Sequence, residues 1–221
     1  SYDNAFWSDA CFCMTFGDGN LFKTLTAMDV AAHEMGHGVC ATTANLAYVG
    51  ESGGLNEANS DILGTMVEFY ALGAGGQGTT VPDTGGNWTI GEQLSTPSFP
   101  TPLRYMQKPS LDGRSPDAWS SSLGGLDVHF SSGPMNRAFY FLSQGSSASA
   151  SDPAYSSYLP GGMSGLGNDK AMRIWWRTLT TRLTSSSNYL AARNGAIAAV
   201  KELYGAGGTE EKAVWNAFAG I

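Results

Sequence analysis

Basic side chains, histidines, cysteines and long apolar runs are all scarce in this chain of 221 residues. Only 12 Lys and Arg stand against 19 Asp and Glu, so the formal net charge is −7. A nucleic-acid-binding protein needs cationic side chains to neutralise phosphates, and this balance therefore argues against a nucleic-acid partner. No apolar run approaches the ~20 residues that span a bilayer, so no membrane partner is expected either.

Cysteine occurs three times, as Cys11, Cys13 and Cys40. In a secreted protein an odd number leaves one thiol unpaired or paired between chains. Cys11 and Cys13 alternate on an expected strand, so their side chains would point to opposite faces and only one could reach Cys40. A disulfide between Cys40 and one of the pair is one possibility, and buried free thiols are the other.

Glycine is abundant by contrast, with 29 residues, and Ser and Thr fill the stretches between expected helices. This pattern suits a secreted, extracellular enzyme with long loops better than a cytosolic helical protein. A chain of this length can bury a core as one large domain or as a domain with a smaller lobe. No secretory leader is evident, which predicts a mature or trimmed form.

Two of the three histidines, His33 and His37, stand in the stretch Asp29–His37. On a helix they lie one turn apart on the same face, where two neutral imidazoles can hold one zinc ion at roughly 2.0–2.1 Å. Glu34 is the next residue round the helix and could reach a water on that ion, as in the zinc-protease pattern H-E-x-x-H. The alternative is a chance match on an ordinary amphipathic helix.

Two features downstream favour the metal interpretation. Glu57 follows a glycine-rich turn and is the candidate for a third zinc ligand, and Asp61 lies one turn later on the same face. Asp61 could accept the second N–H of His33 and so fix its tautomer, although paired carboxylates on a helix are more often a solvated face. The third histidine, His129, follows Asp127 by two residues.

Together these motifs resemble the thermolysin family of zinc metalloendopeptidases, and its pseudolysin and vibriolysin branch in particular. The resemblance covers nearly the whole chain. It runs through Asn4-Ala5-Phe6-Trp7, the zinc helix, Asn56-Glu57-Ala58, Asp127-Val128-His129, Leu203-Tyr204-Gly205 and Ala217-Phe218. Family catalytic domains carry a further β-rich segment of roughly a hundred residues before the position of Asn4, and a domain of the combined length is of ordinary size. The chain is therefore expected to be a compact variant or one piece of a longer protein, with a second fragment as a possible partner.

The resemblance implies an α+β, mainly helical, zincin-type fold. Residues 1–45 would be the remnant of an N-terminal lobe with an edge strand and the zinc helix, and residues 46–221 a C-terminal helical lobe. Pattern and turn signals predict an extended segment over 2–16, a zinc helix over about 27–44 with Thr26 as N-cap, and a helix over about 55–72. Loops are expected over 73–87, 107–125 and 145–166, and further helices over about 168–184, 189–204 and 209–219. The apolar residues expected in the core of these last helices are Trp175, Trp176, Leu179, Ile197, Val200, Leu203, Trp215 and Phe218.

The family's activity would be hydrolysis of internal peptide bonds, preceding bulky apolar residues, by zinc-activated water with Glu34 as general base. By resemblance, Tyr48 and His129 would hold the developing oxyanion, and Asp127 would orient His129. The alternatives are a packing tyrosine for Tyr48 and a hydrogen-bonding role for His129.

Substrate and calcium contacts are likewise implied by the resemblance. Asn4 and Ala5 would hydrogen-bond an extended peptide, or simply form an edge strand, and Arg104 would bind a substrate carbonyl or form a surface ion pair. The apolar wall of the specificity pocket would consist of Val30, Ile90, Leu94 and Leu103. Oxygen ligands for calcium would come from Asp29, Glu68, Asn87, Glu92 and the Thr89 carbonyl. Thermolysin has acidic residues in place of Asn87 and Thr89, so one ion is expected.

Three other functions remain compatible with the sequence. The chain could be a catalytically inactive zincin fold, with its cleft left incomplete by the missing N-terminal segment. It could be an aminopeptidase, although no acidic cluster stands out that would capture a free amine. It could also be a calcium-stabilised binding module without enzymatic activity.

Overall fold

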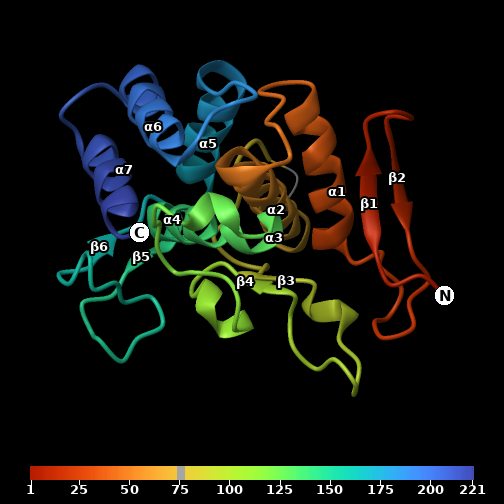
Figure 1. Ribbon diagram of the computed structural model, residues 1–221. Helices are drawn as coiled ribbons and strands as arrows, with labels where there is room; N and C mark the ends of the chain where they lie inside the picture. Colours follow the sequence, from red (N-terminus) through yellow and green to blue (C-terminus); the bar gives the residue numbers. More distant parts are fainter. Residues whose placement is uncertain (74–77) are drawn as a thin grey trace.

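Helices dominate the computed structural model, which describes residues 1–73 and 78–221 (Figure 1). Within these two ranges the strands form three separate two-stranded antiparallel sheets. The strands are β1 Ala5–Ser8, β2 Cys13–Phe16, β3 Thr89–Ile90, β4 Arg104–Tyr105, β5 Gly145–Ser146 and β6 Met163–Ser164. The α-helices are α1 Met28–Ala41, α2 Gly50–Leu72, α3 Val128–Ser131, α4 Gly133–Gln144, α5 Asn168–Arg182, α6 Tyr189–Tyr204 and α7 Thr209–Ala219. The short 3-10 helices are η1 Glu92–Leu94, η2 Pro109–Asp112 and η3 Leu123–Gly125.

The hairpin of β1 and β2 stands beside α1 at the right of Figure 1, with Ala5 paired to Phe16 and Ser8 to Cys13. Of the two possibilities for the cysteines, the disulfide to Cys40 is wrong, because Cys11 forms a disulfide with Cys13. Cys40 is a buried free thiol, as the alternative had it, but Cys11 and Cys13 are not free. The prediction assumed that Cys11 and Cys13 alternate on one strand. Cys11 instead lies in the turn before β2, so strand alternation does not separate the two sulfur atoms.

The two N-terminal helices differ from their expected bounds. The N-cap of α1 is Ala27, without a side-chain cap, so the assignment of Thr26 was wrong. Helix α2 begins at Gly50, before the expected start at Leu55, and therefore includes Gly53 and Gly54. A Cβ at Gly53 would lie 2.4 Å from the Val128 side chain, and one at Gly54 2.5 Å from Ser131. The glycines thus permit close contact with α3, and packing overrides their poor helix propensity.

Helices α1 and α2 pack against each other at two glycines. A Cβ at Gly36 would lie 2.8 Å from the Ser60 Cα, and one at Gly64 would lie 2.6 Å from the Asp29 carbonyl oxygen. Because both neighbours are backbone atoms, any side chain at either position would push the helices apart. This close crossing brings the polar faces of α1 and α2 together.

The main core lies between α2 and the helices α4 to α7, which Figure 1 shows packed on one side of α2. Helices α5, α6 and α7 confirm the expected C-terminal bundle. Three of the expected core residues are wrong, because Trp176, Leu203 and Trp215 are 41–45% exposed. Helical periodicity places an apolar residue on a face but does not say whether another element covers that face. Trp215 instead lies under the guanidinium of Arg193, at 4.5 Å.

The expected loops are mostly irregular. Residues 78–87 form no helix or strand, while 74–77 lie outside the described residues. The 107–125 segment contains η2 and η3, and the 145–166 segment begins and ends near the β5–β6 pair. In the part of the chain that the structure describes, no helix combines the length and apolar character needed to cross a bilayer.

Candidate active site

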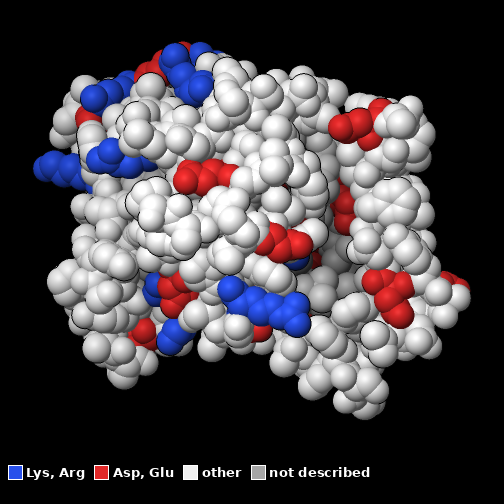
Figure 2. Space-filling model, viewed as in Figure 1, with Lys and Arg blue, Asp and Glu red and all other residues white. Residues whose placement is uncertain are grey.

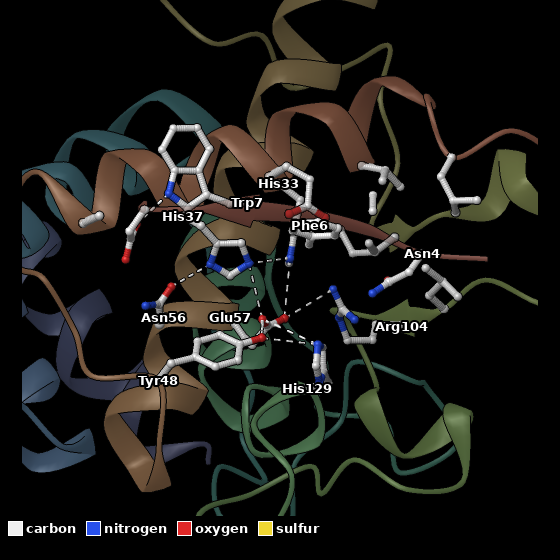
Figure 3. Close-up of a pocket in the computed structure, with 18 of the residues that line it drawn as sticks. Asn4, Phe6, Trp7, His33, His37, Tyr48, Asn56, Glu57, Arg104 and His129 are labelled. Carbon is white, nitrogen blue, oxygen red and sulfur yellow. Dashed lines mark hydrogen bonds and ion pairs between the residues drawn. The ribbon is translucent and has the colours of Figure 1, made fainter. Parts of the chain in front are cut away.

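Three ligand atoms meet where α1 crosses α2 (Figure 3). The Nε2 atoms of His33 and His37 are 3.1 Å apart, and they lie 3.5 and 3.4 Å from the two carboxylate oxygens of Glu57. A tetrahedral ion with bonds of 2.0–2.1 Å separates two ligand atoms by about 3.3–3.4 Å. Among the described residues this is the one group of three or more His, Cys, Asp or Glu whose ligand atoms all lie within 4.8 Å of one another.

The remaining atoms of these side chains show that the group fits zinc. Asp61 Oδ1 accepts a hydrogen bond from His33 Nδ1, and Asn56 Oδ1 accepts one from His37 Nδ1, both at 2.8 Å. Because each Nδ1 is the donor, each Nε2 presents a lone pair to the same point. Glu57 Oε2 is buried without a hydrogen-bond partner. Two lone pairs facing an unpartnered carboxylate oxygen are the arrangement that a bound cation satisfies.

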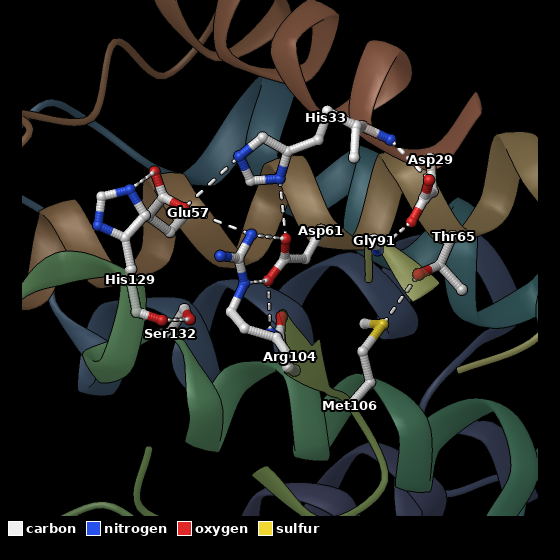
Figure 4. Close-up of polar contacts among 12 residues, drawn as sticks. Asp29, His33, Glu57, Asp61, Thr65, Gly91, Arg104, Met106, His129 and Ser132 are labelled. Atoms are coloured by element: carbon white, nitrogen blue, oxygen red, sulfur yellow. Dashed lines mark hydrogen bonds and ion pairs between the residues drawn. The ribbon is translucent and has the colours of Figure 1, made fainter. Parts of the chain in front are cut away.

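Asp61 connects His33 to Arg104 of β4 (Figure 4). It is fully buried and also accepts hydrogen bonds from Arg104 Nε at 2.7 Å, from an Arg104 terminal nitrogen at 2.6 Å and from the Asn136 amide at 2.8 Å. Burial raises the pKa of Asp61, but the charge of Arg104 and the hydrogen bond from His33 outweigh it, so the pKa lies below its usual value. Asp61 therefore stays ionised and holds the His33 ring.

The other expected catalytic side chains surround the same point. Glu34 is 6% exposed, and this burial raises its pKa. Tyr48 donates a short hydrogen bond to Glu57, and its oxygen lies 3.3 Å from His129 Nε2. His129 Nδ1 in turn lies 2.7 Å from Asp127 Oδ1. Glu34, Tyr48 and His129 thus line one cleft, and Asp127 contacts His129; the four residues come from three separate segments of the chain.

The three zinc-ligand candidates, together with Glu34, Tyr48 and His129, line a cleft of about 370 Å³ between the hairpin and the helical body. The space-filling view shows it as a hollow at the right of the molecule (Figure 2). Ala5 of β1 and the preceding Asn4 form one wall, and Val30, Ile90 and Leu103 lie at the Arg104 end. Leu94 is not part of the lining, because it packs behind the wall with Leu25, Ala27 and Val30.

The expected calcium ligands form a second polar group further along α1 and α2, near the N-terminal end of α1 and the C-terminal end of α2. The Asn87 side chain donates to Glu68 Oε2 at 3.2 Å and to Glu92 Oε1 at 3.1 Å. The Thr89 hydroxyl donates to Glu92 at 3.1 Å. Asp29 is held separately, because its Oδ2 accepts from the Gly91 N–H at 2.5 Å. We call these five residues, Asp29, Glu68, Asn87, Thr89 and Glu92, the calcium group.

Burial is the main reason that the pKa of Glu68 rises to about 7, with repulsion from Glu92 and Asp29 adding to it. The group therefore needs either a proton or a cation to balance its charge. Oxygen-rich surroundings of this kind suit calcium rather than zinc.

Sequence reasoning missed three residues of the site. Asn56 immediately precedes Glu57, so a buried amide beside a ligand could have been considered as the partner of His37. Asn136 gives no local signal, because it reaches Asp61 from α4, 75 positions away. Asp9 lines the cleft at the tip of the hairpin, and its sequence context is that of an ordinary turn residue.

Fold and site together define a zincin-type metal centre, with two histidines from one helix and a glutamate from the next. Models of two domains match the chain, the thermolysin metallopeptidase alpha-helical domain over residues 44–221 and the thermolysin metallopeptidase catalytic domain over residues 1–41. The chain belongs to the thermolysin family of metallopeptidases, whose members are zinc-dependent and calcium-stabilised. The finer resemblance to the pseudolysin and vibriolysin branch stays a prediction.

Individual relatives agree with the family. The chain is 49% identical over its full length to the transglutaminase-activating metalloprotease of Streptomyces mobaraensis, of which it covers 28%. It is 37% identical over 98% of its length to the thermolysin of Alicyclobacillus acidocaldarius, of which it covers 37%. A solved precursor of protealysin, a metalloproteinase from Serratia proteamaculans, superposes with a TM-score of 0.72 at 26% identity, covering 98% of this chain and 64% of that one. The chain thus spans less than two fifths of these two curated relatives.

Proposed function

We propose that this chain carries the zinc-binding and proton-transfer groups of a secreted endopeptidase that cleaves internal peptide bonds preceding bulky apolar residues. The observation that supports it best is the convergence of His33, His37 and Glu57 beside the buried Glu34. The cleft also has an edge strand along one wall, which suits an extended peptide rather than a small molecule.

Bound zinc would supply Lewis-acid activation of water and of the scissile carbonyl. Glu34 would take the proton of the attacking water and return it to the leaving amine, a task that its raised pKa favours. Tyr48 and His129 would donate hydrogen bonds to the developing oxyanion, with Asp127 fixing the His129 ring. Loss of one such donor typically costs ~10²–10³ in rate.

The peptide would bind along the hairpin. In the described part of the chain β1 pairs only with β2, so the backbone groups of Ala5 on its other edge can pair with substrate. The Asn4 carbonyl already accepts from the Gly17 N–H at 2.9 Å, so Asn4 would bind the peptide through its side-chain amide. Arg104 uses Nε and one terminal nitrogen on Asp61, which leaves the other terminal nitrogen for a substrate carbonyl. The apolar side chains at the Arg104 end would hold the residue that follows the cleaved bond.

Three further features belong to the proposal. The calcium group would bind one ion, in keeping with its carboxylates and its single shared amide. Secretion is supported by the Cys11–Cys13 disulfide, since disulfides persist in oxidising compartments. Residues 1–45 and 46–221 would act as two lobes that contribute opposite walls of the cleft, with peptides or proteins as substrates.

Zinc content and cleavage, measured on the same preparations, test the proposal. We expect the zinc-loaded chain to cleave casein, and Glu34→Gln to keep its zinc while kcat/KM falls by about 10²–10⁴. Retained turnover in Glu34→Gln would remove this residue from the mechanism. Release of single N-terminal residues would indicate an aminopeptidase, and calcium without zinc would indicate a binding module. Zinc binding without cleavage by the unaltered chain would indicate an inactive zincin fold.

A further inference from the structure

The cleft continues past the metal ligands to the tip of the β1–β2 hairpin. Figure 3 shows Trp7 and Arg104 at opposite ends of the lining, with His33 and His37 between them. Asp9 lies at the Trp7 end and is part of the same cleft. The proposed mechanism assigns no role to this end, although a bound peptide would extend along it.

The tip is held in a defined shape. Trp7 packs on α1 at Gly38, where a Cβ would lie 2.7 Å from the indole ring. The Phe12 ring meets the Trp7 ring edge to face, with centroids 4.8 Å apart. The Cys11–Cys13 disulfide closes the turn beyond Asp9. These contacts fix Trp7, and Trp7 fixes the neighbouring carboxylate, because its indole N–H donates to Asp9 Oδ1 at 2.7 Å.

The charge of Asp9 is not balanced by the protein. In the described ranges no Lys or Arg lies within 4.0 Å of its carboxylate. Among the described residues, Arg104 is the one Lys or Arg that lines the cleft, and it is bound to Asp61 at the end opposite Asp9. The exposed carboxylate therefore gives this end of the cleft a negative potential, held in place beside an apolar indole surface.

We infer that Asp9 selects a Lys or Arg side chain of the substrate, two or three residues before the cleaved bond. The inference rests on the proposed function, which puts the residue after the bond in the apolar pocket at the Arg104 end. The residues before the bond then run along β1 toward Asp9, at about 3.3 Å per residue. The methylene stem of a basic side chain would lie on Trp7 while its charge pairs with Asp9.

Binding without cleavage tests this charge selectivity directly. Zinc-loaded Glu34→Gln is titrated calorimetrically with matched peptides that carry Lys, Gln or Glu at the second or third residue before a leucine. We expect the Lys peptide to bind about two- to fivefold more tightly than the Gln peptide, the range of an exposed ion pair. The difference should shrink as ionic strength rises, because surface charges are screened.

Substitutions at Asp9 test whether its carboxylate causes the preference for the Lys peptide. Adding Asp9→Asn, which keeps an acceptor for the Trp7 N–H, should remove the preference, and Asp9→Lys should reverse it toward the Glu peptide. Asp18→Asn is the matched control, since it removes one exposed carboxylate of the same segment outside the cleft lining. Equal binding of the Lys and Gln peptides, or a preference that survives Asp9→Asn, overturns the inference.

Cleavage of the same peptides separates this inference from the proposed function. With Glu34 intact, the ratio of kcat/KM for the Lys and Gln peptides should follow the binding ratio and fall to about one in Asp9→Asn. If the peptides bind with selectivity that depends on Asp9 but none is cleaved, the endopeptidase proposal fails while the cation-selective end of the cleft stands.

Discussion

The three zinc-ligand candidates His33, His37 and Glu57, here called the zinc-ligand triangle, lie where α1 crosses α2, and the calcium group lies further along the same helices. Both contain or contact buried carboxylates, but the negative charge is balanced differently in the two. In the triangle, the negative charges of Glu57 and Asp61 face two histidines and Arg104. In the calcium group, Glu68 and Glu92 share the amide of Asn87, and no Lys or Arg of the described residues is within ion-pair distance. The triangle is therefore preformed, whereas the calcium group depends on a cation or a proton.

Removing a ligand from the triangle should give the largest effect. Glu57→Gln replaces the buried carboxylate by a neutral amide, which is a much weaker zinc ligand. We expect zinc affinity to fall by more than the ~10–100-fold that is typical of losing an outer partner, and cleavage to fall to background. Competition with a chromogenic chelator measures the affinity. Zinc binding equal to that of the unaltered chain would show that Glu57 is not a ligand.

Removing an outer partner should have a smaller effect on the same centre. Asn56→Ala frees the Nδ1 of His37, and we expect zinc affinity to fall by about 10–100-fold. Asn56→Asp is the matched control, because it keeps an acceptor at the same place and should restore most of the affinity. If alanine and aspartate weaken zinc equally, the hydrogen bond to His37 does not preorganise the site.

The calcium group should make stability depend on pH when no metal is bound. The pKa of Glu68 is raised to about 7 in the folded chain, against an ordinary value near 4.3. The folded state therefore binds this proton more tightly, so the free energy of unfolding should fall as pH rises from about 4.5 to 7. We expect a loss of about 1–3 kcal/mol over this window. Urea unfolding of the metal-free chain at several pH values measures it.

Calcium and a matched variant sharpen this test. Added calcium should restore stability at pH 7.5 and have little effect near pH 5, where Glu68 is protonated. Glu68→Gln should flatten the pH profile between 4.5 and 7 and weaken the calcium response. A metal-free chain whose stability rises through this window would contradict the assignment of the proton to Glu68.

The smallest effect is expected from a substitution at the crossing of α1 and α2, which connects the zinc-ligand triangle to the calcium group. Gly64→Ala gains up to ~1 kcal/mol of helix propensity, but its Cβ would meet the Asp29 carbonyl oxygen at 2.6 Å. Overpacking against rigid backbone costs about 1–3 kcal/mol, so we expect a net loss of about 1 kcal/mol in thermal unfolding. Gly161→Ala, with nothing near its Cβ, is the control. Unchanged stability of Gly64→Ala would show that the helices can separate at no cost.

The histidine pair at the centre of the molecule could be predicted from the sequence, whereas the start of α2 and the disulfide could not. The H-E-x-x-H spacing fixes His33 and His37 on one face of any helix, so the pair needed no tertiary information. The start of α2 and the pairing of Cys11 were wrong for different reasons. Packing against α3 kept Gly53 and Gly54 in the helix despite their low propensity, whereas a local turn at Cys11 brought its sulfur to that of Cys13.

The sequence by itself determined the ligand types, their spacing on each helix and the order of the C-terminal helices, because these follow from covalent spacing and helical periodicity. Only the tertiary structure decided that α1 and α2 cross at Gly36 and Gly64, and that Asn136 and Arg104 reach Asp61 from distant segments. The tertiary structure also put the carboxylate of Asp9 in the cleft. The physical reason is that convergence on one point depends on how closely backbones approach, and that distance is set by packing between segments far apart in the chain.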